Sequence, residues 1–439
     1  MNFTYRKILE IVVPLIISGF GQSIIYVTDI LFLGRLGEIA LGASAIAGLF
    51  YASIMMIGFG ISSGLQVLIA QKVGEDKSSE THRLLLNGIL LQVLISIVIT
   101  LLYYLFRSFL IYLFVKNIQV GEATEQFLNI RILGLLPYFI FYAYRSYYLG
   151  IGSTKIISGV TIVMSILNLI LNPVLIYGWE FIQPMNYLGS AAASVISEYI
   201  STFIIMLYYA YSKKSARFIS HIEKLVLKNI MQTSLPLIFQ HFISVFSWFL
   251  FFVFIEKMGT KELATSNVIR AVYVLVMAPI LAFSHSTITI VGQLFGGKAY
   301  STMNNTLWKI IYLSMIFTLP FSCLSFFKPE WLMMIFTDNG EIIHQGRNLM
   351  RLVAFALMYF AFSMPWLSAV TGIGETNKAL VIESLSFIIY ILASYLFVFV
   401  LKWDLLKVWL NEFVYFTSIF MFSKWFYTEK MKSVLKEND

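Results

Sequence analysis

The chain has 439 residues, of which 59% are hydrophobic, 16% aromatic and only 12% charged, and its mean hydropathy is +0.81. This composition excludes an ordinary soluble globular protein. The net charge of +8 is not gathered into a basic domain that could bind nucleic acid, and a single cysteine, Cys323, excludes an intramolecular disulfide and a cysteine-based metal cluster.

Apolar runs long enough to cross a bilayer as helices recur from one end of the chain to the other. Strands of a membrane barrel would show short alternating segments instead, so the predicted fold class is an all-α polytopic membrane protein. The twelve predicted transmembrane helices are 9–33, 42–70, 86–114, 126–149, 156–178, 187–211, 230–255, 264–295, 306–327, 348–371, 379–401 and 406–427.

The sequence also contains an internal repeat, which appears without a gap when the chain is shifted so that Gln71 falls on Gln293. Gly74 then falls on Gly296, and the turn 150–152 falls on the turn 372–374 with the same Gly-Ile-Gly sequence. Six spans per copy is an even number, so both copies enter the membrane from the same side. The pattern predicts two six-helix lobes related as parallel repeats.

The repeat and the charges predict the domain organisation. We expect an N-lobe at 1–212, a basic cytoplasmic linker at 213–228, and a C-lobe with a short basic tail at 229–439. Lys and Arg are more frequent in the loops that are cytoplasmic if the N-terminus is cytoplasmic, which places both termini inside. The expected location is therefore a cytoplasmic (inner) membrane, crossed many times.

Polar residues inside the predicted spans mark a candidate site, because an ionisable group within a membrane costs free energy. Asp29 is the clearest of these residues, and it shares a helical face with Gln22 and Tyr26 through their i, i+4, i+7 spacing. Asn168 and Asn172 share a face of the fifth span. An alternative is that Asp29 only caps a helix end or bonds between helices.

The sixth span adds a stripe of hydroxyl groups with one carboxylate beside it. Its members are Ser190, Ser194, Ser197 and Ser201, and Glu198 is a secondary candidate for a proton carrier. Three helices of one lobe thus offer oxygen atoms around one carboxylate, which suits a proton or a hard cation. The repeat equivalents of Asp29, Asn168, Asn172 and Ser194 are Phe251, Tyr390, Ser394 and Phe416, so we expect that the second half has not kept this cluster.

A second set of residues is a candidate for the lining of a substrate cleft. Aromatic and amide side chains suit flat, amphipathic or cationic organic molecules. The candidates are Gln22, Tyr26, Tyr144, Gln240, His241, Ser244 and Trp248. Hydrogen bonding between helices is an equally good interpretation of the polar residues of the seventh span, and a buried structural role is an alternative for His241.

Several motifs together resemble the multidrug and toxic compound extrusion (MATE) transporters. The segment 27–37, which reads Val-Thr-Asp and ends in Gly-Arg-Leu-Gly, is similar to their first-span signature. Gln71 with Gly74 resembles their loop motif, the turn 150–155 resembles their Gly-x-Gly-Asp-Thr pattern, and 168–173 resembles their fifth span. The similarity extends over essentially the whole chain.

The resemblance implies an N-lobe cation site at Asp29, Asn168, Asn172 and Ser194, which would also hold Na⁺ if Na⁺ is the coupling ion. Some DinF-like members carry Asp at the position of Asn172. NorM-like members carry a Glu where Ser244 stands and an Asp in the tenth span, which has no acid between 351 and 371. The pattern is therefore nearer to DinF-like than to NorM-like members.

The expected function is a secondary antiporter that exports organic compounds in exchange for H⁺ or Na⁺, as a monomer in the lipid bilayer and without a cofactor. A flippase for lipid-linked oligosaccharides or peptidoglycan precursors is the first alternative. A membrane-embedded enzyme is an alternative of another class, but the sequence shows no metal-ligand cluster, no nucleophile–base pair and no nucleotide motif. We therefore expect neither a nucleotide nor a nucleic acid as a partner.

Overall fold

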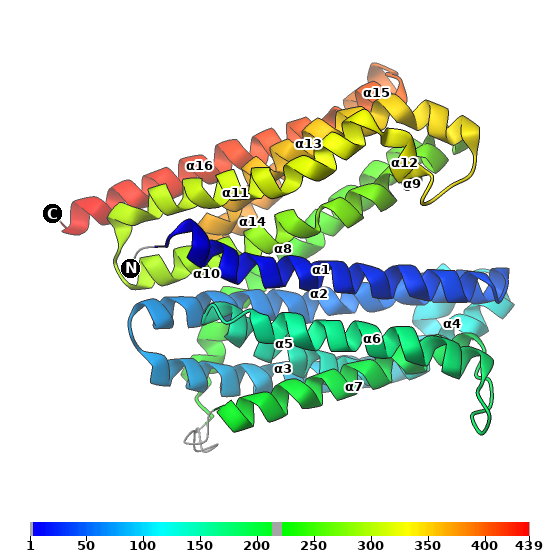
Figure 1. Cartoon of the computed structure of the whole chain (residues 1–439), viewed down its shortest axis with the longest axis horizontal. Coiled ribbons are helices and arrows are strands. Elements are labelled where there is room, and N and C mark those ends of the chain that lie inside the picture. The colour runs from blue at the N-terminus through cyan, green and yellow to red at the C-terminus, as the bar shows by residue number, and fades with distance from the viewer. Residues whose placement is uncertain (1–2, 213–221, 439) are drawn as a thin grey trace. The chain divides into compact units, whose positions relative to one another are not determined.

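The structure is a computed structural model that describes residues 3–212 and 222–438, without the side chains of Tyr26, Val27, Ile30, Leu31, Phe114, Glu437 and Asn438. In the first half the helices are α1 Tyr5–Gly34, α2 Glu38–Gly74, α3 Ser78–Phe114, α4 Ile118–Arg131, η1 Ile132–Gly134, α5 Leu135–Gly150, α6 Lys155–Tyr177 and α7 Tyr187–Ser212 (Figure 1). In the second half they are α8 Lys224–Glu256, α9 Thr260–Val276, α10 Ala278–Gly296, α11 Tyr300–Phe327, α12 Pro329–Met333, α13 Gly340–Gly372, α14 Thr376–Tyr395, η2 Leu396–Val400, α15 Leu405–Val408 and α16 Asn411–Asn438.

Twelve candidate membrane spans, chosen by length and apolar composition, lie within the described residues. The predicted all-α polytopic fold is therefore confirmed. One span differs from the sequence expectation: 264–295 is not a single helix, because the chain breaks at Met277 between α9 and α10. Pro279 lies at the start of α10, where its missing N–H costs no hydrogen bond, and it could not stand in the interior of a continuous helix without loss of one.

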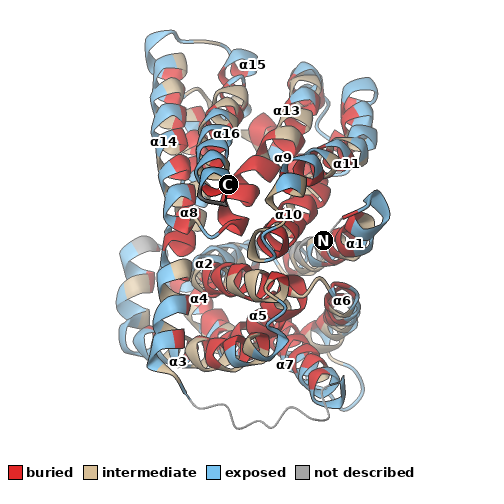
Figure 2. Cartoon of the chain, turned by 90° about the vertical axis from the view of Figure 1, so that its left-hand side faces the viewer, coloured by how far each residue is buried: buried red, intermediate tan, exposed pale blue. Residues whose placement is uncertain are grey.

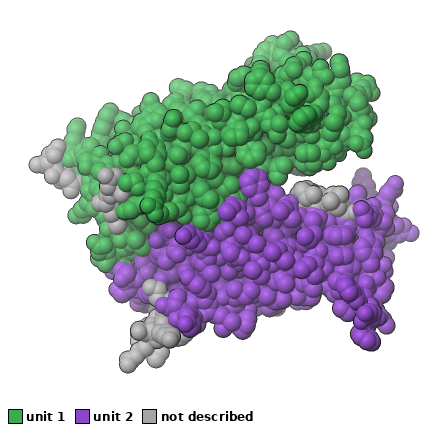
Figure 3. Space-filling view, viewed as in Figure 1, with its two compact units in different colours: residues 1–16, 70–77, 235–439 green, residues 17–69, 78–234 purple. Residues whose placement is uncertain are grey.

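The chain divides into two compact units (Figure 3). Unit 1 contains residues 1–16, 70–77 and 235–439, and unit 2 contains residues 17–69 and 78–234. Each unit has its own apolar core: that of unit 2 includes Phe127 and Phe139, and that of unit 1 includes Met350 and Trp409. The expected division into lobes at 212 and 229 stays a prediction, and Lys213, Lys214 and Arg217 of the basic linker lie outside the described residues.

The outward surfaces of the helices are strongly apolar, as expected for contact with lipid. On α3, Leu101, Leu105 and Phe109 are between 64% and 73% exposed. Figure 2 shows the buried residues gathered on one side of many helices and the exposed ones on the other. Side chains of this kind on a water-facing surface would be an aggregation hazard, whereas in a bilayer they are solvated by hydrocarbon.

The repeated Gln-x-x-Gly motif forms a reciprocal contact inside unit 1. A methyl group on Gly74 would come within 2.1 Å of the carbonyl oxygen of Gln293, and one on Gly296 would come within 2.1 Å of the carbonyl oxygen of Gln71. The side-chain Nε2 of Gln71 also donates to the carbonyl of Gly372 at 3.2 Å. The motif therefore serves close backbone packing, which only glycine permits.

Candidate functional site

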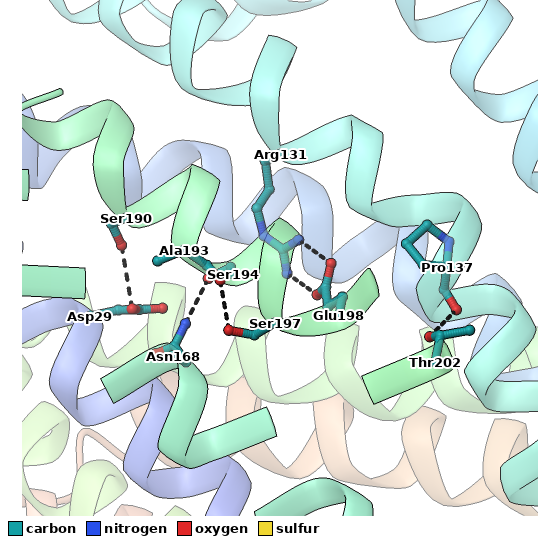
Figure 4. Close-up of polar contacts among 10 residues, drawn as sticks. All are labelled: Asp29, Arg131, Pro137, Asn168, Ser190, Ala193, Ser194, Ser197, Glu198 and Thr202. Atoms are coloured by element: carbon teal, nitrogen blue, oxygen red, sulfur yellow. Dashed lines mark hydrogen bonds and ion pairs between the residues drawn. The ribbon is translucent and has the colours of Figure 1, made fainter. Parts of the chain in front are cut away.

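Asp29 lies near the end of α1 in unit 2, where two other helices reach its carboxylate. Asn172 of α6 donates from Nδ2 to Oδ1 of Asp29 at 2.8 Å, and the hydroxyl of Ser190 of α7 donates to the same oxygen at 3.3 Å. Asp29 is only partly buried, whereas Asn172 and Ser190 are fully buried. The structure thus brings a carboxylate from the first span to the amide and hydroxyl groups of the fifth and sixth spans. Figure 4 shows the contact of Asp29 with Ser190 and the neighbouring Asn168.

The hydrogen bonds continue from Asp29 to the other expected residues. Asn172 donates from Nδ2 to Oδ1 of Asn168 at 2.9 Å, and Asn168 donates from its own Nδ2 to the hydroxyl of Ser194 at 3.1 Å. Within the described part of the chain, Oδ1 of Asn172 is buried without a hydrogen-bond partner. An amide oxygen can only accept, so this atom is available to a donor or a cation.

Helical spacing and one glycine explain why these groups meet. Asn168 and Asn172 are four residues apart on α6, and Ser190 and Ser194 are four apart on α7, so each pair lies on one face. Gly189 allows the two helices to approach, because a methyl group there would lie 2.5 Å from the carbonyl carbon of Leu175. The close approach occurs one residue before Ser190.

Glu198, the secondary candidate for a proton carrier, forms a buried ion pair. Its carboxylate accepts two hydrogen bonds from the guanidinium of Arg131, at 2.6 and 2.7 Å (Figure 4). The ring of Tyr51 lies 3.9 Å from the same guanidinium. The side chains of Glu198 and Arg131 are 4% and 16% exposed. The role of Glu198 in proton transfer stays a prediction.

The cleft candidates of unit 2 have different surroundings. Gln22 is exposed, and the side chain of Tyr26 lies outside the described residues. Tyr144 is buried and packs edge-on against Tyr209, with ring centres 5.4 Å apart. Tyr144 therefore lies within a packed aromatic cluster, and contact with a substrate would require that cluster to open.

Two of the four cleft candidates of unit 1 lie beside a buried carboxylate, that of Glu383. Glu383 of α14 accepts a short hydrogen bond from the hydroxyl of Tyr415, and the side chains of Ser244 and Gln240 of α8 also interact with its carboxyl group. His241 is partly buried on the same helix. Trp248 packs edge-on against Tyr273, with ring centres 5.2 Å apart. Any contact of these residues with a substrate stays a prediction.

One buried carboxylate was missed by sequence reasoning. Glu412 of α16 is 1% exposed, and its Oε1 accepts from the hydroxyl of Tyr390 at 2.9 Å. The residues equivalent to the Asp29 cluster carry no acid in the second half, and Glu412 stands instead on a different helix from that of Asp29. The available signal was the repeat itself: Glu412 is the repeat equivalent of Ser190, the residue that contacts Asp29.

Asp29, Asn168, Asn172, Ser190 and Ser194 form one hydrogen-bonded cluster, the Asp29 network. This network has the oxygen atoms that a site for a proton or a hard monovalent cation needs. It offers one carboxylate together with amide and hydroxyl oxygens. Among the described residues there is no group of three or more His, Cys, Asp or Glu side chains that could hold a metal ion. The geometry thus suits H⁺ or Na⁺ better than a transition metal.

The family model MatE matches this chain twice, at residues 14–174 and 236–396, and the shift that aligns Gln71 with Gln293 also carries the first match onto the second. A protein of Synechocystis described as a probable multidrug resistance protein NorM is 24% identical over 433 residues, which cover 94% of this chain and 92% of that protein. A Bacillus subtilis protein described as the probable multidrug resistance protein YoeA is 22% identical and covers 81% of this chain and 78% of its own length.

Solved structures agree with the fold. The crystal structure of MATE in complex with MaL6 superposes with a TM-score of 0.91 at 17% identity and covers 98% of this chain and 97% of that one. A mutant form of the Vibrio cholerae MATE transporter VcmN superposes with a TM-score of 0.88 at 18% identity and covers 98% of this chain and 97% of that one. With twelve candidate spans and two copies of the family pattern, the chain belongs to the MatE family of membrane transporters and is not an enzyme.

Proposed function

We propose that this chain is a secondary antiporter that exports cationic or amphipathic organic compounds in exchange for H⁺ or Na⁺ bound at Asp29, Asn168, Asn172 and Ser194. The observation that carries the proposal is the continuous hydrogen-bond network from Ser194 through Asn168 and Asn172 to Asp29. The relatives described as multidrug resistance proteins support the class of substrate. A coupling ion takes the place of a cofactor.

Binding of an ion at Asp29 changes the charge of a partly buried group, and this links the ion to the conformation of the protein. A proton would neutralise the carboxylate, whereas Na⁺ would be held by the carboxylate and by Oδ1 of Asn172. The driving force is about 2.3 kcal/mol per charge for each 100 mV of membrane potential and about 1.4 kcal/mol per unit of pH difference. Occupancy of the site would bias the equilibrium between inward-open and outward-open states.

We further propose the arrangement in the membrane. The protein acts as a monomer in the cytoplasmic membrane with both termini inside, and it consists of an N-lobe at 1–212, a linker at 213–228 and a C-lobe at 229–439. The substrate contacts Gln22, Tyr26, Tyr144, Gln240, His241, Ser244 and Trp248. Because Ser244 stands where NorM-like members carry a Glu and no acid lies between 351 and 371, we also propose an ion site nearer to that of DinF-like members, although the similar proteins are named NorM, YoeA and MdtK.

The experiment that tests the proposal is efflux of a fluorescent organic cation from reconstituted vesicles under an imposed pH or Na⁺ gradient. Three proteins are compared: the wild type, Asp29→Asn and Asp338→Asn. Asp338 is exposed in a loop, so its substitution is the matched control for the same chemical change. Insertion and folding of each protein are checked by size-exclusion chromatography.

We expect the wild type and Asp338→Asn to export the dye under one gradient, which identifies the ion, and we expect Asp29→Asn to lose the gradient dependence. Gradient-driven export that is unchanged in Asp29→Asn would refute the site. Absence of export by the wild type under either gradient would refute the antiporter itself and favour the flippase alternative.

A further inference from the structure

Glu412 is a buried carboxylate in the second half of the chain that the proposed mechanism does not use. Its two oxygens accept hydrogen bonds from Tyr390 at 2.9 Å and from Tyr273 at 3.5 Å, and Trp248 is a third donor. Among the described residues, no Lys, Arg or His forms an ion pair with it. A charge in such surroundings costs free energy unless it is paired or neutralised, so we expect this residue to have a functional role.

The internal repeat places Glu412 at a position equivalent to the Asp29 network. The shift that aligns the two halves makes Ser190 correspond to Glu412 and Asn168 correspond to Tyr390. In the first half Ser190 bonds to the carboxylate of α1, and in the second half Glu412 itself supplies the carboxylate. Phe251 stands where Asp29 stands in the repeat, and its ring lies 5.5 Å from that of Tyr390. The carboxylate thus stands on the first helix of the repeat in the first half and on the sixth helix in the second half.

The surroundings of Glu412 also contain an amide group that resembles the one near Asp29. Asn411 donates from Nδ2 to the hydroxyl of Ser394 at 2.6 Å and to the carbonyl of Tyr390 at 3.1 Å. Its Oδ1 is buried without a hydrogen-bond partner in the described chain, as is Oδ1 of Asn172 in the first half. Ser394 corresponds to Asn172 in the repeat. Among the described residues, each half thus contains one buried amide oxygen of this kind in its own polar cluster.

We propose that Glu412, with Tyr390, Tyr273 and Asn411, forms a second proton-binding site, related to the Asp29 network by the internal repeat. The ligand is a proton because aromatic rings and hydroxyl donors already pack around the carboxylate. A metal cation would need several oxygen ligands in an open coordination sphere, whereas a proton needs none. The site is independent of Asp29, and only its role in coupling rests on the proposed function.

A second buried carboxylate, that of Glu383, lies beyond a tyrosine ring that neighbours this site. The ring of Tyr390 lies 5.2 Å from that of Tyr415, and the hydroxyl of Tyr415 donates to Glu383. The titratable groups that face Glu412 are therefore Tyr273 of α9, Tyr390 of α14 and Tyr415 of α16, with Glu383 reached through Tyr415. On α13, Tyr359 bonds to Thr417 instead. The two acids and their tyrosines would form a path for protons within unit 1.

The proposal is tested by infrared spectroscopy of the purified full chain during a pH titration, because a protonated carboxyl group gives a C=O stretching band that its carboxylate lacks. The background is Asp29→Asn, which removes the signal of the first site. Glu412→Gln is then added in one protein and Glu429→Gln in another. Glu429 lies on the same helix and is exposed, so it is the matched control.

We expect a titrating carboxyl band in the Asp29→Asn protein that persists with Glu429→Gln and loses one component with Glu412→Gln. Tyr390→Phe gives a second readout that keeps the ring: loss of its hydroxyl bond shifts the Glu412 component to higher frequency. A carboxyl band that is altered neither by Glu412→Gln nor by Tyr390→Phe would overturn the proposal. If Na⁺ but not K⁺ abolished the Glu412 component of the band at constant pH, the proposal of a proton site would be wrong and a Na⁺ site would replace it.

Transport measurements on the same proteins separate this site from the proposed function. If Asp29→Asn exports normally, the first site fails while the infrared result for Glu412 still stands on its own. If the Glu412 component is absent, the second site fails whether or not Asp29 couples transport. For coupling we expect Glu412→Gln in the wild-type background to reduce the number of protons taken up per substrate exported, and Glu429→Gln to leave it unchanged.

Discussion

The ion pair between Arg131 and Glu198 gives the sharpest prediction of stability. Both side chains are largely buried, and the two hydrogen bonds between them, at 2.6 and 2.7 Å, use both oxygens of the carboxylate. Glu198→Gln keeps the shape of the side chain but leaves the guanidinium without its counter-charge. Removal of one partner of a buried pair costs about 3–5 kcal/mol, so we expect a loss of this size in the free energy of unfolding.

The double substitution should cost less than either single one. Replacement of Arg131 and Glu198 together by Met removes both charges, and apolar replacements of buried pairs are often close to neutral. The loss of unfolding free energy in the double variant should therefore be smaller, by about 3 kcal/mol or more, than the sum of the losses in Arg131→Met and Glu198→Met. Gly134→Ala should weaken the same pair, because its methyl group would lie 2.1 Å from Oε2 of Glu198.

The assay is a reversible denaturant titration in detergent micelles, followed by tryptophan fluorescence. The control is Glu429→Gln, since Glu429 pairs with Lys432 at 3.2 Å on the surface and both side chains are more than half exposed. An exposed pair contributes between about 0 and 1 kcal/mol. A loss for Glu198→Gln no larger than that of the control, or additive effects in the double variant, would refute the reasoning.

Three further predictions use the same titration or the export assay. Gly74→Ala and Gly296→Ala should each lose about 1–3 kcal/mol of unfolding free energy, because each added methyl would meet a backbone carbonyl. Gly34→Ala is the control and should be neutral, because a methyl there would have no atom within 4 Å. Equal losses in all three variants would contradict this prediction. Gly37→Ala should lose about 1–2 kcal/mol, since its φ of +106° disfavours a side chain, and a neutral result would show that the turn can rearrange. Ser190→Ala removes a hydrogen bond to Asp29 and should change the concentration of the coupling ion at half-maximal export by roughly tenfold; an unchanged value would separate Ser190 from the ion site.

Much of the fold could be predicted from the sequence because a bilayer imposes a simple rule on helix length. Each predicted span has a counterpart among the helices. The break between α9 and α10 was missed, since an apolar window does not register a single proline when the residues on both sides are apolar. The contact of Asp29 with Asn172 could be anticipated because helical spacing gives the face of each helix and the family resemblance gives the partner helix.

The remaining polar contacts depend on which helices are neighbours, and periodicity alone does not contain that information. Arg131 and Glu198 lie 67 residues apart on helices whose packing no local pattern specifies. Glu412 was missed for another reason. It stands at the beginning of an apolar run, where an acid usually reaches water, and only the fold shows that Tyr390 and Tyr273 enclose it.

The reciprocal contact of Gln71 and Gly74 with Gln293 and Gly296 has a consequence for the history of the chain. Each copy of the motif supplies a glycine to receive the other copy's carbonyl, so the surface is complementary to itself. Self-complementary surfaces are what two identical subunits present across a two-fold axis. A half-length chain with this motif would carry both sides of the contact, and gene fusion would then have turned a homodimer interface into an internal one. Once fused, the two halves could diverge, and their buried carboxylates now stand on different helices of the repeat, α1 and α16.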